Sequence, residues 1–153
     1  MHRITLALAL FILPWIHLSG ITIKTAYTRY YEDGDIRPIG QYFGGSLKWQ
    51  GFRTVIASDP ATPAGQYFIA KINNSDSVQP TKARMTLYLS NSKNSSTYTW
   101  NLTGESVKGW LYLGLTGKDW PSEQVKPLAW KIELLGADDS LMVEWKSFLW
   151  EMP

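Results

Sequence analysis

Short runs of alternating apolar and polar residues recur from Leu47 onward, and turn residues separate them. This spacing predicts seven β-strands, near residues 47–57, 66–72, 83–90, 97–102, 110–115, 128–135 and 141–150. Outside the first twenty residues, no window of about a dozen residues keeps a 3.6-residue period with helix caps. The pattern therefore predicts an all-β domain over residues 47–153, built as an antiparallel β-sandwich.

Residue parity predicts which side chains are buried, because side chains alternate between the two faces of a strand. The expected core faces are Phe68, Ala70 and Ile72; Met85, Leu87 and Leu89; Tyr98, Trp100 and Leu102; Leu128, Trp130, Ile132 and Leu134; and Leu141, Val143 and Trp145. Past Lys146 the alternation breaks, which indicates a bulge or a last strand that is buried on both sides.

The strand number, the turn spacing and the terminal hairpin AWKIELL…LMVEWKSFLW resemble the immunoglobulin and fibronectin type III sandwiches over about two-thirds of the chain. The chain has no Cys, so it lacks the Cys…Trp…Cys pattern of true immunoglobulin domains. The resemblance implies an architecture and no particular function, because one such fold hosts many functions.

The first twenty residues are typical of an export signal. A basic start at Arg3 precedes the apolar run from Ile4 to Ile16, and the small residues Ser19 and Gly20 follow. The alternatives are an uncleaved membrane anchor over residues 4–23, or a buried core helix. We expect an exported chain that is periplasmic, cell-surface or secreted, and that meets a membrane only if this segment is retained.

Residues 21–46 join the expected signal to the expected sandwich. The sequence ITIKTAYTRYY alternates like a strand, whereas Pro38, Gly40, Gly44 and Gly45 indicate irregular structure. The segment is therefore either an N-terminal strand added to a sheet edge or a spacer.

Both histidines, His2 and His17, lie in the expected signal, and there is no Cys. A mature chain from about Ile21 would have neither residue, although most acid–base, nucleophilic and transition-metal chemistry uses one of them. We therefore expect no enzyme, no metal and no cofactor. The formal net charge of +2 is mixed along the chain, so we also expect no nucleic-acid partner.

Aromatic residues left outside the expected core are the candidate ligand-binding residues. In the strand expected at 110–115 the three leucines face one way, and Trp110 and Tyr112 face the other. We expect Tyr88 and Trp49 to extend this patch, because flat aromatic surfaces bind sugars or protein partners. The alternative is that the N-terminal segment or an irregular loop covers the face. Trp120 is a further candidate, although we favour a plug over the end of the sandwich, because Trp is highly buried on average.

Other polar motifs have simpler explanations. Asp138 and Asp139 are typical of a hairpin turn, and a calcium site would need nearby carboxylates such as Asp59, Asp76 and Asp119. Three N-x-S/T sequons, at Asn73, Asn94 and Asn101, allow glycosylation in a host that performs it.

Glu133 and Glu144 are the candidate residues for a carboxylate-based hydrolase, on neighbouring strands of the terminal hairpin. Each alternates with a lysine, Lys131 or Lys146, on a face that the pattern predicts to be solvated. Pairing of Glu with Lys between the strands would explain both residues without chemistry.

The function that we expect is a non-catalytic binding or assembly module with a protein partner or with itself as partner. One alternative is a carbohydrate-binding module that uses the exposed aromatics, and another is the small hydrolase. The sequence names no ligand.

Overall fold

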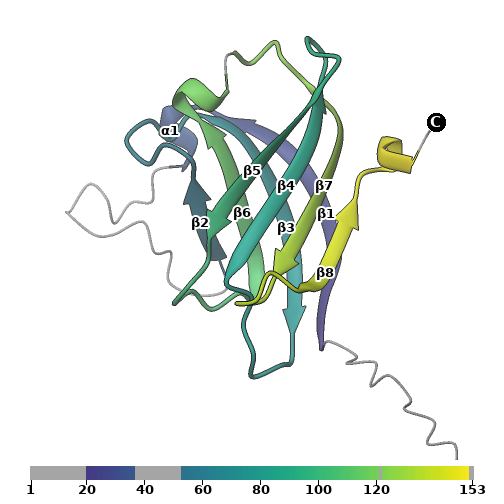
Figure 1. Cartoon of the computed structure of the whole chain (residues 1–153). Helices are drawn as coiled ribbons and strands as arrows, with labels where there is room; N and C mark the ends of the chain where they lie inside the picture. Colours follow the sequence, from purple (N-terminus) through teal and green to yellow (C-terminus); the bar gives the residue numbers. More distant parts are fainter. Residues whose placement is uncertain (1–19, 37–52, 121, 152–153) are drawn as a thin grey trace, which may run out of the picture.

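The computed structural model describes residues 20–36, 53–120 and 122–151, and eight strands within these ranges form two sheets (Figure 1). Sheet A has the spatial order β1 (Ile21–Tyr31), β3 (Gly65–Asn74), β6 (Gly109–Thr116) and β2 (Arg53–Ala57). Sheet B has the order β5 (Ser95–Asn101), β4 (Lys82–Leu89), β7 (Pro127–Leu135) and β8 (Leu141–Lys146). The short helical turns are α1 (Asp33–Ile36), η2 (Gly117–Asp119) and η3 (Phe148–Glu151).

One apolar core lies between the sheets, and the strands of sheet B pass in front of sheet A in Figure 1. Phe68 of β3 meets Trp130 of β7 edge to face, with ring centroids 5.5 Å apart. Leu111, Leu113 and Leu115 of β6 belong to the same core. The inward residues of both sheets therefore bury each other. The chain is mostly β and its two sheets are largely antiparallel, which confirms this part of the prediction.

One strand pair differs from the expected antiparallel arrangement. β2 pairs with β6 in parallel, with Arg53 beside Trp110 and Ala57 beside Gly114. Residues 47–52, which we expected to begin this strand, lie outside the described residues. Alternation gives the face of each residue but not the direction of its neighbouring strand, so the sequence pattern could not distinguish the two pairings.

The segment from Ile21 to Tyr31 is a full strand of sheet A. It pairs with β3 from Ile21 opposite Asn74 to Tyr31 opposite Gly65, with a register shift between Ile23 and Thr25. Ile21 is buried in the core that the two sheets share. β1 is therefore part of the same packed unit as the strands that follow residue 47.

The end of the chain differs from the expected long strand at 141–150. β8 stops at Lys146, because the Ser147 carbonyl no longer accepts from β7. The Ser147 N–H donates to the Trp130 carbonyl at 2.8 Å, but it is the Ser147 hydroxyl that accepts from the Trp130 N–H, at 2.9 Å, and the Ser147 carbonyl accepts from the Trp150 N–H at 3.0 Å. η3 follows, and Phe148 is 85% exposed. Leu128 and Leu141 were expected in the core but are about half exposed, since each lies at a strand end beside a register shift.

Candidate functional site

The outer face of sheet A carries the aromatic side chains that the core leaves over. Because the leucines of β6 point inward, Trp110 and Tyr112 point outward, as their parity predicts. They join a second, smaller apolar cluster around Tyr67 and Ile69 of β3. We call this surface the aromatic face and define it by Tyr27, Tyr31, Tyr67, Ile69, Val55, Trp110 and Tyr112.

The strand registers arrange this face in rows across the sheet. One row runs from Tyr27 through Ile69 and Tyr112 to Val55, over all four strands. In the next row, Lys71 and Arg53 flank Trp110. The face is thus assembled from residues of four strands that are separated along the chain.

Ring contacts join neighbouring rows. The rings of Tyr27 and Trp110 have centroids 6.1 Å apart at an interplanar angle of 74°, and those of Tyr31 and Tyr67 are 5.6 Å apart at 82°. Edge-to-face pairs of this kind are favoured by the ring quadrupoles. Tyr27 is 44% exposed, so its ring is accessible at the edge of the face.

Tyr67 anchors the face and is fully buried. Its hydroxyl donates to the Pro63 carbonyl at 2.8 Å, and burial raises the pKa of the phenol far above its usual value. Its ring lies over Gly114, where a Cβ would come within 2.5 Å of the ring. Tyr67 therefore holds the face in place. Ile69 is buried as well, most of the other members are partly buried, and among the residues that define the face only Tyr27 is exposed.

The charges on this face are positive. The Lys71 ammonium lies 5.6 Å from the centroid of the Trp110 ring, and the Arg29 guanidinium lies 4.9 Å from that of Tyr31. Both distances are within the range of cation–π attraction. Burial raises the pKa of the Tyr112 phenol, and nearby Arg53 partly opposes that change. The described residues of the rows that contain Tyr27, Arg29 and Lys71 include no Asp or Glu.

Tyr88 does not extend the aromatic face, which corrects the expectation. Tyr88 is on β4 of sheet B, is 41% exposed, and contacts Trp150 at a ring distance of 5.9 Å. The Lys131 ammonium lies 5.5 Å from the centroid of the same Trp150 ring. Parity correctly placed Tyr88 outward from the core, but its strand belongs to the other sheet.

The candidate Trp120 is not part of the aromatic face. Trp120 is 5% exposed and packs in the core, as the interpretation of a plug expects. Its indole N–H has no hydrogen-bond partner among the residues that the structure describes. Trp49 lies outside the described residues.

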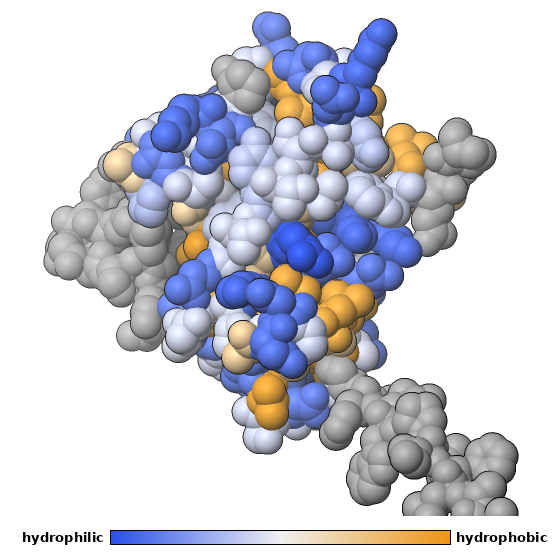
Figure 2. Space-filling model, in the orientation of Figure 1, coloured by the Kyte–Doolittle hydropathy of each residue, from blue (hydrophilic) through white to orange (hydrophobic). Residues whose placement is uncertain are grey.

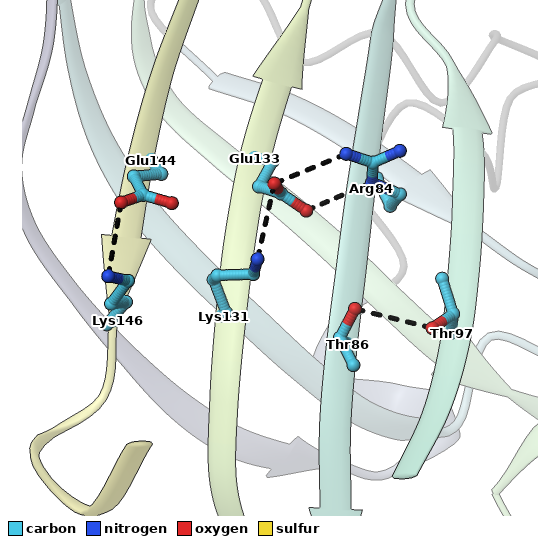
Figure 3. Close-up of polar contacts among 7 residues, drawn as sticks. All are labelled: Arg84, Thr86, Thr97, Lys131, Glu133, Glu144 and Lys146. Carbon is cyan, nitrogen blue, oxygen red and sulfur yellow. Dashed lines mark hydrogen bonds and ion pairs between the residues drawn. The ribbon is translucent and has the colours of Figure 1, made fainter. Parts of the chain in front are cut away.

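The outer face of sheet B carries the two carboxylates of the hydrolase hypothesis (Figure 3). Glu133 and Glu144 are direct neighbours in the register, but the cross-strand partner of Glu133 is Arg84, at 3.0 and 3.2 Å. Lys131 is 3.3 Å from Glu133, and Lys146 is 3.3 Å from Glu144, each on the same strand as its partner. The expected pairing of Glu with Lys between strands is absent from this described face, because the register sets Glu opposite Glu and Lys opposite Lys. Figure 2 shows this side of the molecule as mostly hydrophilic.

The electrostatics of Glu133 do not suit a general acid. Its hydrogen bond from Arg84 lowers the pKa of the carboxyl, burial acts in the opposite direction, and Lys131 lowers the pKa further. A glycosidase acid needs a raised pKa so that it carries a proton near neutral pH. The arrangement is that of a surface ion-pair cluster.

The loop aspartates serve local structure. Asp59 accepts from the Ala61 N–H at 3.0 Å, Asp76 accepts from the Gly20 N–H at 2.7 Å, and Asp139 pairs with Lys82 at 2.7 Å. Asp138 accepts from the Ser140 hydroxyl at 2.6 Å. In the described part of the chain, no group of three or more acidic or histidine side chains is placed to hold a metal ion.

All three sequon asparagines are exposed, and Asn101 accepts a hydrogen bond from the Thr103 N–H at 2.8 Å. The expected signal or anchor, residues 1–19, lies outside the described residues. Among the helices that the structure does describe, none has the length and apolar character to cross a membrane.

Sequence reasoning missed the part of the aromatic face that β1 and β3 contribute, namely Tyr27, Arg29, Tyr31, Tyr67 and Lys71. The alternation in TAYTRYY was a usable signal for the β1 residues. Comparison of the chain with protein-family models, with curated proteins and with solved structures gave no match.

Proposed function

We propose that this protein is an exported, non-catalytic binding module that recognises an acidic protein partner through the aromatic face of sheet A. The observation that carries the proposal is the set of exposed cations beside aromatic rings, with Lys71 next to Trp110 and Arg29 next to Tyr31. Interface cores are enriched in Trp, Tyr and Arg, and complementary charge at the rim steers association. The site of action that fits this proposal is the cell surface or the periplasm.

We also propose that the architecture is immunoglobulin- or fibronectin III-like. The spatial order of sheet B, β5-β4-β7-β8, corresponds to C′-C-F-G of such sandwiches, and the order β1-β3-β6 of sheet A corresponds to A-B-E. β2 takes the place beyond strand E and runs parallel to it. These correspondences support an interaction module, because such sandwiches present flat sheet faces and loops rather than deep clefts.

The binding test compares two charge reversals with the same chemistry. Envelope proteins from the source cell are captured with three proteins: the unaltered protein, Lys71→Glu and Lys93→Glu. The affinity of each captured protein for each of the three is then measured directly. Lys71 lies on the aromatic face, whereas Lys93 is exposed in the turn between β4 and β5. We expect Lys71→Glu to weaken binding of the specific partner at least tenfold, and Lys93→Glu to leave it unchanged. A partner bound equally by all three proteins would place recognition elsewhere.

Trp110→Ala tests the aromatic part of the face. Truncation of a central aromatic at an interface costs about 2 kcal/mol or more, a loss of about 30-fold in affinity. Trp110 is half-buried, so the variant is used only if its thermal unfolding remains cooperative. Retention of full affinity by a folded Trp110→Ala would contradict the proposed face.

A carbohydrate-binding module is the second candidate, and the accessible ring of Tyr27 beside Trp110 favours it. A glycan array distinguishes the two candidates. Binding of a neutral glycan that is lost in Trp110→Ala but kept in Lys71→Glu would favour sugar stacking over an acidic protein partner.

Mass spectrometry of the N-terminus, on protein recovered from its native compartment, tests export.

A further inference from the structure

In the described part of the chain the two sheets end in four edge strands, and their edges differ in how they are protected against pairing with another chain. Sheet A ends in β1 and β2, and sheet B ends in β5 and β8. An open edge presents unpaired N–H and C=O groups, and natural proteins block it with charges, Pro, bulges or very short strands.

β1 carries two such devices. Lys24 and Arg29 are exposed on it, and the register with β3 shifts between Ile23 and Thr25. A bulge bends the strand, so that a second straight strand cannot follow it.

β2 and β8 are protected in similar ways. β2 is only five residues long and begins with the charged Arg53. β8 carries Glu144 and Lys146, and its register with β7 shifts between Leu134 and Leu135. Charged side chains thus lie on all three of these edges, and on β1 they are all positive.

β5 has none of these devices. Its sequence, SSTYTWN, contains no charged residue and no Pro. It pairs with β4 without a register shift, from Asn101 opposite Lys82 to Ser95 opposite Tyr88. Its Thr, Tyr and Trp residues are the types that strands favour.

The hydrogen-bond phase shows which backbone groups of β5 face away from β4. Opposite residues in an antiparallel pair of strands alternate between hydrogen-bonded and non-hydrogen-bonded pairs. The Leu102 N–H donates to the Thr81 carbonyl at 2.8 Å, so Leu102 and Thr81 form a hydrogen-bonded pair. Because the two kinds of pair alternate, Trp100, Tyr98 and Ser96 also direct their backbone groups at β4. The 3.3 Å contact between the hydroxyls of Thr86 and Thr97 fits the alternate, closer kind of pair.

The outward backbone groups of β5 are those of Ser95, Thr97, Thr99 and Asn101. The side chains of Ser95, Thr97, Thr99 and Asn101 are all exposed. β5 thus presents an uncharged row of donors and acceptors, which no described strand pairs on its outward side, and such a row is the template for one more strand.

We propose that β5 pairs antiparallel with β5 of a second copy of this chain and extends sheet B across a twofold axis at Tyr98. In this register Thr97 lies opposite Thr99 of the second copy, and Ser95 lies opposite Asn101. All four outward residues then exchange both backbone hydrogen bonds, and Tyr98 faces its own counterpart in a non-hydrogen-bonded pair. A twofold contact of this kind is self-complementary.

A second copy fits this edge because β5 carries no charge that would oppose itself. Thr–Thr and aromatic pairs across strands are stabilising, and this register supplies both through Thr97, Thr99 and Tyr98. The Thr86–Thr97 contact would continue into Thr99 of the second copy, making one polar row across the joint sheet.

The dimer leaves the aromatic face free and doubles it. β5 is at the edge of sheet B, whereas the aromatic face is on sheet A, so the two proposals depend on different residues. Two copies of one recognition face raise the apparent affinity for a partner that repeats. Either proposal can fail while the other stands.

The first test measures association of the protein as recovered from an exporting host without N-glycosylation, so that no glycan is attached at Asn101. Sedimentation velocity is run from about 1 to 200 μM protein, a range that covers a micromolar Kd. Thr99→Pro removes an outward N–H without removing a bond to β4, and edge strands tolerate such a proline. Thr99→Val is the matched control, because it keeps the N–H and the branched side chain.

The expected result is a reversible dimer for the unaltered protein, at least tenfold weaker association for Thr99→Pro, and association within about twofold of normal for Thr99→Val. An unaltered protein that stays monomeric over the whole range would overturn the proposal. Equal dimerisation by a folded Thr99→Pro would overturn it as well.

The second test uses the absence of Cys from the chain. Tyr98→Cys places two thiols across the axis, where the Cα atoms of a non-hydrogen-bonded pair are about 4.5 Å apart and a disulfide can form. Ser95→Cys is the control, because its two copies would be about 20 Å apart along the paired strands. Ser95 is also the more exposed residue, so random collision would cross-link it faster.

We expect a covalent dimer from Tyr98→Cys under mild oxidation and at least tenfold slower cross-linking of Ser95→Cys. Equal or faster cross-linking of Ser95→Cys would exclude this register. Should Thr99→Pro fail to fold, the two cysteine variants decide the question alone.

Discussion

Arg84 of β4 donates two parallel hydrogen bonds to Glu133 of β7, at 3.0 and 3.2 Å, across the middle of sheet B (Figure 3). The Glu133 side chain is 9% exposed and that of Arg84 is 41% exposed, so the pair is only partly screened by solvent. A paired, fork-shaped contact of this kind favours one register between the strands, because a shift of one residue would place the two groups on opposite faces of the sheet.

Glu133→Gln should lower the free energy of unfolding at neutral pH by about 1–2 kcal/mol. It removes two charge-assisted hydrogen bonds, and partial exposure of Arg84 moderates the loss. Glu144→Gln is the matched control, since it is exposed and faces Glu133 across the strands. We expect its effect to stay below about 0.5 kcal/mol. Urea denaturation measures the free energy of unfolding of both variants. An equal loss in the two would contradict a specific contribution of the contact between Arg84 and Glu133.

The same residue predicts a dependence of stability on acid pH. Because the folded state lowers the pKa of Glu133 below its unfolded value of about 4.3, its contribution is fully present above that pH. It is lost as the pH falls through the lower, folded-state pKa. Unfolding measured from pH 6 downward should show a steeper loss below about pH 4 for the unaltered protein than for Glu133→Gln. Parallel curves for the two proteins would contradict the assignment.

Gly114→Ala should destabilise the protein by about 1–3 kcal/mol. The added Cβ would come within 2.5 Å of the buried Tyr67 ring, and overpacking of this kind costs about that much. Gly34→Ala is the control, because no atom lies within 4 Å of its Cβ position. Thermal unfolding compares them, and similar melting temperatures for the two variants would refute the close packing of Tyr67 on Gly114.

Tyr67→Phe should destabilise the protein by about 1–2 kcal/mol, because the buried Pro63 carbonyl loses its hydrogen-bond donor. Burial raises the pKa of this phenol, so the folded state favours its protonated form. This contribution to stability is fully present below about pH 10, the usual tyrosine pKa, and it is lost as the pH rises further. The unaltered protein should therefore lose stability above about pH 10 more steeply than Tyr67→Phe. Alkaline unfolding followed by fluorescence measures both proteins. A difference in stability between them that stays constant as the pH rises would contradict this prediction.

Deletion of residues 1–31 should abolish cooperative folding, whereas deletion of residues 1–19 should preserve it. The longer deletion removes β1, uncovers the edge of β3 and takes the buried Ile21 from the core. Urea transitions and solubility of both truncated chains provide the measurement. A soluble, cooperative chain without β1 would show that the strand is dispensable.

The positions of the strands were predictable because alternation is a local property. The strands expected at 66–72, 83–90, 97–102, 110–115 and 128–135 correspond to β3, β4, β5, β6 and β7. Parity also placed Trp110 and Tyr112 outward from the leucine core. The last strand was predicted too long, because the turn at Ser147 depends on hydrogen bonds with Trp130, which is distant in sequence.

The candidate site was predictable only in part. Parity assigns a residue to the outside of its sheet, but it does not say which sheet contains its strand. Tyr88 and Trp110 were therefore expected in one patch, although they lie on different sheets. Tyr27 was not expected there, yet its ring contacts Trp110.

The sequence by itself determined where β3 to β7 run, which of their faces are buried and that Cys is absent, because backbone alternation and residue type act locally. The tertiary structure alone decided strand order, the parallel pairing of β2 with β6, and hence which aromatic and basic residues share a face. Strand order depends on the combined packing of both sheets around one core, and no single run of residues carries that information.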